Sequence, residues 1–190
     1  MHLRTVWLTA LTCSVALSVS AEASAYPQIE FQPESATFAA ATEEYSEIWR
    51  TEGARISAAL EEATGLPMEA GPIHAIVYDG ISNSGYRRMP MYMRASYPPD
   101  TKRATLVHEL AHRLISGYVG KDEEDHPVIF LFVYDVWLRL WGREFADAQV
   151  EVEGERTGRY DYARAWREAL ALGADGRAQH WRQFLADRRS

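Results

Sequence analysis

Cysteine is almost absent from this chain of 190 residues: the single one, Cys13, lies in the N-terminal segment. A framework of disulfides is therefore excluded, and so is a metal site built on thiolates in the rest of the chain. Basic residues are also in the minority, because 20 Lys and Arg against 27 Asp and Glu give a net charge of −7. Without a local basic patch, this balance argues against nucleic acid as a partner.

Apolar residues, by contrast, are plentiful. Hydrophobic residues make up 47% of the chain, charged residues make up 25%, and there are six Trp, ten Tyr and six Phe. These values are typical of an ordinary soluble globular protein whose core needs no disulfides. The length favours one domain, which we expect to span residues 26–190.

The first 25 residues have the layout of a secretory signal peptide. A short cationic start is followed by an apolar run from Val6 to Val19 and then by Ala23-Ser24-Ala25, which offers an A-x-A cleavage site before Tyr26. The sequence therefore predicts a secreted or periplasmic protein with no stable membrane insertion after cleavage. The alternative is an uncleaved anchor, although about 14 apolar residues are short for a bilayer span.

Hydrophobic periodicity predicts an α+β fold that is mainly helical with a small sheet. Large apolar residues recur at helical spacing between Ser35 and Ala63, which indicates a long amphipathic helix. Two strands are expected over 73–78 and 89–96. The second should be an edge strand, since Pro90 cannot donate a hydrogen bond to a neighbouring strand.

Helices are expected throughout the second half of the chain. One should begin with Asp100 or Thr101 as its cap and run to about Tyr118. A second, apolar nearly all round, should run from His126 to Trp141 through the middle of the protein. Two or three more helices should follow. Their expected inner-facing residues are Phe145, Trp166, Leu170, Trp181 and Phe184.

The chemistry is concentrated in His108-Glu109-Leu110-Ala111-His112 on the first of these helices. At 3.6 residues per turn His108 and His112 lie one above the other, so that two imidazoles can bind one Zn²⁺. Glu109 points to the side where a metal-activated water would lie. The alternative interpretation is a pair of surface histidines with Glu109 as a solvated charge.

With this motif the sequence resembles the zincin metallopeptidases, either small gluzincin-like or Spartan-like ones. The resemblance covers about residues 73–141 and implies a sheet with an edge strand beside the HExxH helix. It also implies that His108 and His112 are zinc ligands and that Glu109 is the general base of a zinc peptidase. Arg113 departs from the extended pattern, which prefers an uncharged residue there, and Tyr118 stands where metzincins have a third His.

A catalytic zinc needs a third protein ligand. His126 is the first candidate, because Spartan-like proteases place a third His similarly after a loop, although their DNA-bound substrates are not carried over. Asp135 is the alternative third ligand, at a distance closer to that of the thermolysin-like gluzincins. Glu123 and Glu124 are weaker candidates, and His74 and His180 are expected to be core or surface residues.

The predicted reaction is hydrolysis of peptide bonds in a peptide or protein substrate by a zinc-activated water, with Glu109 as the proton carrier. A hydrogen-bond donor to the oxyanion could come from Tyr118, Tyr134 or Tyr160. The strand 89–96 could pair with an extended substrate, unless a loop or the first helix covers its edge. An exported binding module and a structural zinc protein remain as alternative functions.

Overall fold

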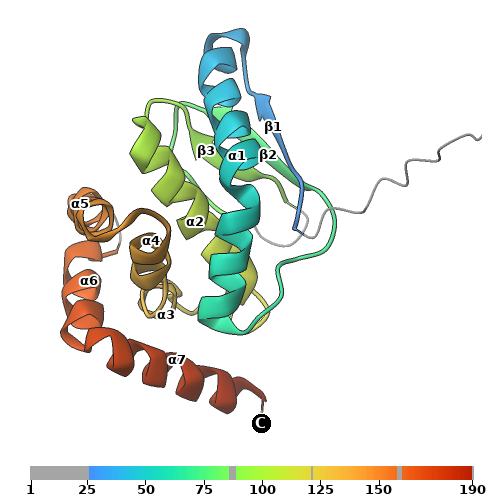
Figure 1. Cartoon of the computed structure of the whole chain (residues 1–190). Coiled ribbons are helices and arrows are strands. Elements are labelled where there is room, and N and C mark those ends of the chain that lie inside the picture. The colour runs from blue at the N-terminus through green and yellow to red at the C-terminus, as the bar shows by residue number, and fades with distance from the viewer. Residues whose placement is uncertain (1–25, 86–88, 121, 158–159, 190) are drawn as a thin grey trace, which may run out of the picture.

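The computed structural model describes residues 26–85, 89–120, 122–157 and 160–189. The predicted signal segment 1–25 lies outside the described residues. Helices dominate, and one small sheet accompanies them, which confirms the expected α+β class (Figure 1). No helix in the described ranges is both long enough and apolar enough to cross a membrane.

The sheet has three parallel strands in the order β1-β2-β3: β1 (Ile29–Pro33), β2 (Ile73–Tyr78) and β3 (Met91–Arg94). The prediction of strands over 73–78 and 89–96 is confirmed, with the second shortened to four residues. The prediction missed β1, although Ile29 and Phe31 alternate with polar residues. Five residues ending in a proline are a weak signal, and pairing with β2 decides the outcome.

Helices cover one face of the sheet. The turn η1 (Ala36–Phe38) leads into α1 (Ala39–Thr64), which packs against β1, and α2 (Pro99–Ile115) lies beside α1 and β3. Ile73, Ala75 and Val77 of β2 are buried on this face, while His74 on the other face is exposed. Gly65 ends α1 in the left-handed region, with φ of 68°, and donates its N–H to Glu61.

The start of α2 differs from the prediction. Pro98 occupies the cap position and Pro99 the first turn, so neither Asp100 nor Thr101 caps the helix. Proline suits the first turn because the N–H that it lacks would have no partner there. The helix ends at Ile115 instead of Tyr118, and a turn follows it.

The predicted helix 126–141 is broken in two. α3 (His126–Ile129) and α4 (Val133–Trp141) are separated by residues 130–132. The aromatic rings at the break pack in different directions: Phe130 stacks on Trp166 at 3.8 Å between centroids, and Phe132 meets Trp181 edge-on at 5.0 Å. Tertiary packing therefore overrides the continuous helical pattern of this segment.

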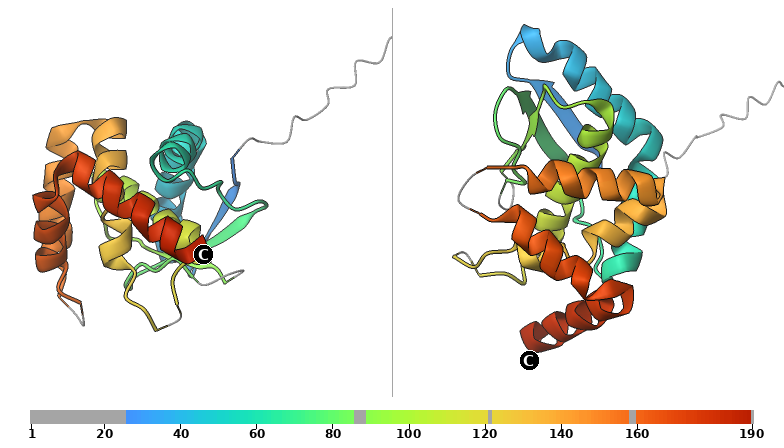
Figure 2. Two further views of the ribbon diagram at one scale, coloured as in Figure 1. Left: turned by 90° about the horizontal axis from the view of Figure 1, so that it is seen from below. Right: turned by 90° about the vertical axis from the view of Figure 1, so that its left-hand side faces the viewer.

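Three more helices complete the chain: α5 (Arg143–Gly154), α6 (Tyr162–Ala171) and α7 (Gly173–Arg189). With α3 and α4 they form a layer on the side of α1 and α2 that faces away from the sheet (Figure 2). The predicted inner faces are confirmed for Trp166 and Trp181, which are buried, whereas Phe145, Leu170 and Phe184 are half-buried at the core boundary. Helix α2 thus lies between the sheet and the layer formed by α3 to α7.

Asp135 of α4 forms an ion pair with Arg177 of α7. The guanidinium donates from Nε at 2.9 Å and from Nη2 at 2.6 Å to the two carboxylate oxygens. The prediction of Asp135 as the alternative third zinc ligand is therefore wrong, because its carboxylate is bound to Arg177. Arg139, one turn further along α4, pairs with Glu62. The ion pair of Asp135 with Arg177 links α7 to α4.

Replacing Asp135 by alanine is expected to lower the free energy of unfolding by about 1–3 kcal/mol, because Arg177, only 3% exposed, would remain without its hydrogen-bond acceptor. The change should be smaller than for a fully buried pair, since the Asp135 side chain is 32% exposed. Urea denaturation measures this change. Arg139→Ala is the matched control, since its partner Glu62 is exposed and the pair contributes little. Equal stabilities of the two variants would contradict the assignment.

Candidate metal centre

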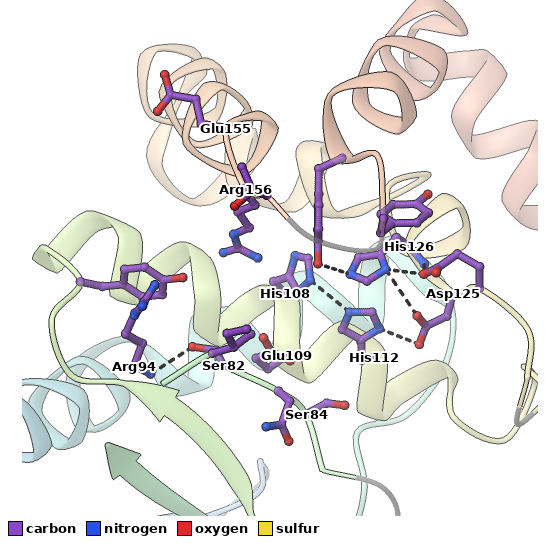
Figure 3. A pocket seen from close by; sticks show the side chains of 17 residues that line it. Ser82, Ser84, Arg94, His108, Glu109, His112, Asp125, His126, Glu155 and Arg156 are labelled. Carbon is purple, nitrogen blue, oxygen red and sulfur yellow. Dashed lines mark hydrogen bonds and ion pairs between the residues drawn. The ribbon is translucent and has the colours of Figure 1, made fainter. Parts of the chain in front are cut away.

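Three histidine side chains converge between α2 and α3, two of them buried and His126 half-buried. His108 and His112 project from one face of α2, one turn apart, and their Nε2 atoms are 3.0 Å from each other. His126, the first residue of α3, completes the group, in which one ring nitrogen from each residue lies within 4.8 Å of the others. Figure 3 shows the three rings facing a common point. The structure therefore brings together the two motif histidines and the preferred third candidate.

Each of the three histidine rings has a carboxylate next to its Nδ1 atom. Asp125 lies 2.7 Å from His112 Nδ1, and Glu124 lies 2.5 Å from His126 Nδ1. Glu153 of α5 lies 2.8 Å from His108 Nδ1, although not in line with the ring N–H. Carboxylates in this position fix the tautomer that leaves Nε2 free to bind a metal.

The protein environment shifts the pKa values of the three histidines in different directions. Burial lowers the pKa of His108 to about 4, which keeps the ring neutral as a metal ligand must be. Burial would raise the pKa of Glu153, but His108 and Arg156 outweigh it and lower the pKa to about 2. Burial also lowers the pKa of His126. At His112 burial acts in the same direction, but the hydrogen bond to Asp125 and the charge of Glu109 outweigh it and raise the pKa. A divalent metal ion that accepts nitrogen ligands would displace any proton from His112 Nε2 on binding.

Glu109 is the third functional residue of the motif. It follows His108 on α2, is 3% exposed, and lines the same cavity without belonging to the group of three histidines. Burial raises its pKa to about 7, and the nearby charges of His112 and Arg156 oppose that rise. Its place beside the histidines suits a carboxyl group that exchanges a proton with a substrate.

The histidines open into a cavity of about 750 Å³. Tyr160 and Tyr162 line it on the side of α6. The ring of Tyr160 stacks on His126, with 4.6 Å between centroids, and Tyr162 Oη lies 3.0 Å from His126 Nε2. Of the three tyrosines expected from the sequence, only Tyr160 lines this cavity; Tyr134 donates its hydroxyl proton to Asp147 instead.

None of the other candidate ligands belongs to the group of three histidines. Asp135 is bound to Arg177, and Glu123 binds Arg188 and the N–H of Gly120. Glu124 supports His126 from the Nδ1 side. His74 is exposed and pairs with Glu30, and His180 is exposed on α7, as expected of surface residues.

Arg113, which departs from the zincin pattern, has a structural role. Its guanidinium donates to the backbone oxygens of Ser84 and Met89, at 2.8 and 3.2 Å, and pairs with Glu69. Ser84 lines the cavity. Arg113 therefore ties the HExxH helix to the loop that forms the rim of the cavity.

The edge of β3 beside the cavity is already occupied. Asn83 and Tyr92 exchange two backbone hydrogen bonds of 2.9 Å in an antiparallel bridge, and Ser82 Oγ accepts the N–H of Arg94. The expectation that β3 itself pairs with a substrate is therefore wrong, because the loop that follows β2 turns back and covers it. Residues 81–84 now form the side of the cavity next to the sheet.

Sequence reasoning missed Asp125, Glu153, Arg156 and Tyr162. Asp125 directly precedes His126 and could have been found as its neighbour in the polar loop. The others reach the cavity from α5, from the segment after it and from α6, and nothing in the local sequence pattern links those elements to α2. No family model, curated protein or solved structure matches the chain, so its own geometry carries the interpretation.

Replacing Glu153 by glutamine is expected to weaken metal binding by about 10–100-fold, because His108 loses the anion that orients it. The amide keeps the size of the side chain and can still accept the hydrogen bond from Trp166 Nε1. Competition with a metal-chelating dye measures the affinity. Glu151→Gln, an exposed position on the same helix, is the control, and equal affinities of both variants would refute the role of Glu153.

Proposed function

We propose that this protein is a zinc-dependent peptidase. The observation that carries the proposal is the convergence of three carboxylate-supported imidazoles beside the buried Glu109, in a cavity open to a substrate. Three nitrogen ligands with one open position are the arrangement of catalytic zinc, whereas structural zinc sites are closed by a fourth protein ligand. Among the described residues the group contains only three such side chains.

Zinc in this site would supply a Lewis acid that polarises a peptide carbonyl and activates water. Glu109 accepts the proton of the attacking water and then delivers it to the nitrogen of the leaving amine. Tyr162 directs its hydroxyl toward Nε2 of His126 and can donate a hydrogen bond to the oxyanion that develops on the substrate. His108, His112 and His126 hold the metal, and their carboxylates keep the rings in place.

The experiment combines metal analysis with a hydrolysis assay. We expect about one zinc ion per purified chain, and cleavage of a mixed peptide library, detected by mass spectrometry, that a chelator abolishes and added zinc restores. Absence of metal would favour an exported binding module. Bound zinc without cleavage of any peptide would favour a structural zinc protein.

A secreted or periplasmic location is part of the proposal, and it is based on the sequence of residues 1–25. N-terminal sequencing of the exported protein tests it, with Tyr26 as the expected first residue. Retention of the run from Val6 to Val19 would contradict cleavage.

A further inference from the structure

Two arginine side chains line the cavity from different parts of the fold, and neither takes part in the proposed reaction. Arg94 is the last residue of β3, and Arg156 follows α5. In Figure 3 both lie on the opposite side of His108 from His126 and Asp125. The cavity therefore has a cationic side next to the metal-binding side.

Arg94 lacks a partner for its charge. Its Nε is buried and has no hydrogen-bond partner, and among the described residues its guanidinium makes no ion pair. Within the described ranges, its cationic group faces the ring of Tyr97, with 5.5 Å between Cζ and the ring centroid. A buried guanidinium N–H without a partner costs free energy, which an anionic ligand in the cavity would recover.

Arg156 is only partly neutralised. Its side chain is 21% exposed, and the ion pair that it makes among the described residues, with Glu153 at 3.4 Å, is longer than a strong hydrogen bond. Glu153 already faces His108 and accepts a hydrogen bond from Trp166, so its charge is shared among three groups. Arg156 also stands near Glu109, since the charge of each acts on the pKa of the other.

The acidic side chains around the cavity do not cancel this cationic side. Glu124 and Asp125 are occupied by His126 and His112 on the far side. Glu155 is exposed, and in Figure 3 it points away from the other labelled residues. Among the acidic groups that line the cavity, this leaves Glu109, which the proposed reaction uses.

We infer that Arg156 and Arg94 bind a carboxylate of the substrate close to the bond that is cleaved. Guanidinium groups are the side chains best suited to a carboxylate, because their paired N–H donors match its two oxygens. The inference rests on the proposed peptidase function, because that function makes the bound carboxylate part of a substrate. Such a carboxylate is either the free C-terminus of a peptide or an Asp or Glu side chain.

Three short peptides distinguish these sources: acetyl-Ala-Ala-Ala with a free carboxylate, its C-terminal amide, and the amide of acetyl-Ala-Asp-Ala. Their binding is measured by calorimetry in the presence of a chelator, so that no carboxylate gains affinity from a metal. We expect at least one carboxylate peptide to bind about 10–100-fold more tightly than the uncharged amide. Tighter binding of the first peptide assigns the site to a C-terminus, and tighter binding of the third assigns it to an acidic side chain.

Arg156→Gln and Arg94→Gln should each reduce this preference, and Arg156→Lys should retain part of it, provided that circular dichroism shows each variant folded. Arg50→Gln, an exposed arginine of α1, is the control that leaves it unchanged. Equal binding of all three peptides, or a preference that survives both glutamine variants, would overturn the inference. Because the readout is binding, carboxylate preference without any hydrolysis would refute the peptidase proposal alone, and zinc-dependent hydrolysis without the preference would refute the inference alone.

Discussion

His126→Ala is expected to lower the affinity for zinc by about 100–1,000-fold, because a structural site of four ligands contributes about 10–16 kcal/mol in total and this variant removes one ligand. The fold should persist, since His126 begins a short helix beside a polar loop and contributes little to the core. Competition against a chelating dye measures the affinity, and circular dichroism checks the helix content.

Two controls make this result specific. His180→Ala removes an exposed histidine of α7 and should leave zinc binding unchanged. Asp135→Asn removes the rival third ligand, and the structure places that carboxylate on Arg177, so zinc binding should persist. Loss of zinc in a folded Asp135→Asn protein together with full binding by His126→Ala would overturn the proposed ligand set.

The histidine pair was predictable because it depends on helical geometry alone. Residues four apart on a helix share a face, and the structure places His108 and His112 accordingly on α2. His126 was harder, since its position depends on how the loop 116–125 returns the chain to α2. The break between α3 and α4 separates His126 from Asp135, and the two residues have different partners: His126 lies with His108 and His112, and Asp135 binds Arg177.

The supporting groups of the site could not be predicted, because they come from elements distant in sequence. Glu153 reaches His108 only because α5 packs against α2. Arg156 lies just after α5 and Tyr162 begins α6, and both line the cavity. Helical periodicity identifies buried positions, but it does not identify the partner of a charged residue such as Glu153. The sequence also does not distinguish a buried ion pair from an exposed one.

The sheet was only partly predictable for a similar reason. Strand β2 has the β-branched residues and the bounding turns that mark a strand, whereas β1 is short and its pairing partner lies beyond the 26 residues of α1. The bridge between Asn83 and Tyr92 depends on a loop that turns back on β3. Both features follow from nonlocal hydrogen bonds that a local pattern does not encode.

Glu109→Gln is expected to abolish peptide hydrolysis while zinc remains bound. The amide has the size of the carboxylate, so a side chain that is 3% exposed can be replaced without a cavity, but it cannot accept the proton of the attacking water. Removal of a general base costs about 10²–10⁴-fold in kcat, and KM should change little because Glu109 binds neither the metal nor the proposed substrate carboxylate.

The role of Glu109 is decided by comparing Glu109→Gln with His112→Ala. The His112→Ala variant should lose zinc and hydrolysis together. Metal content by elemental analysis and rates of peptide cleavage are measured on the same samples. If Glu109→Gln also loses zinc, Glu109 is a ligand or a structural residue; if it keeps its activity, another group carries the proton. The three histidines and their carboxylates remain intact in Glu109→Gln. If this variant retains zinc but loses hydrolysis, Glu109 transfers the proton and does not bind the metal.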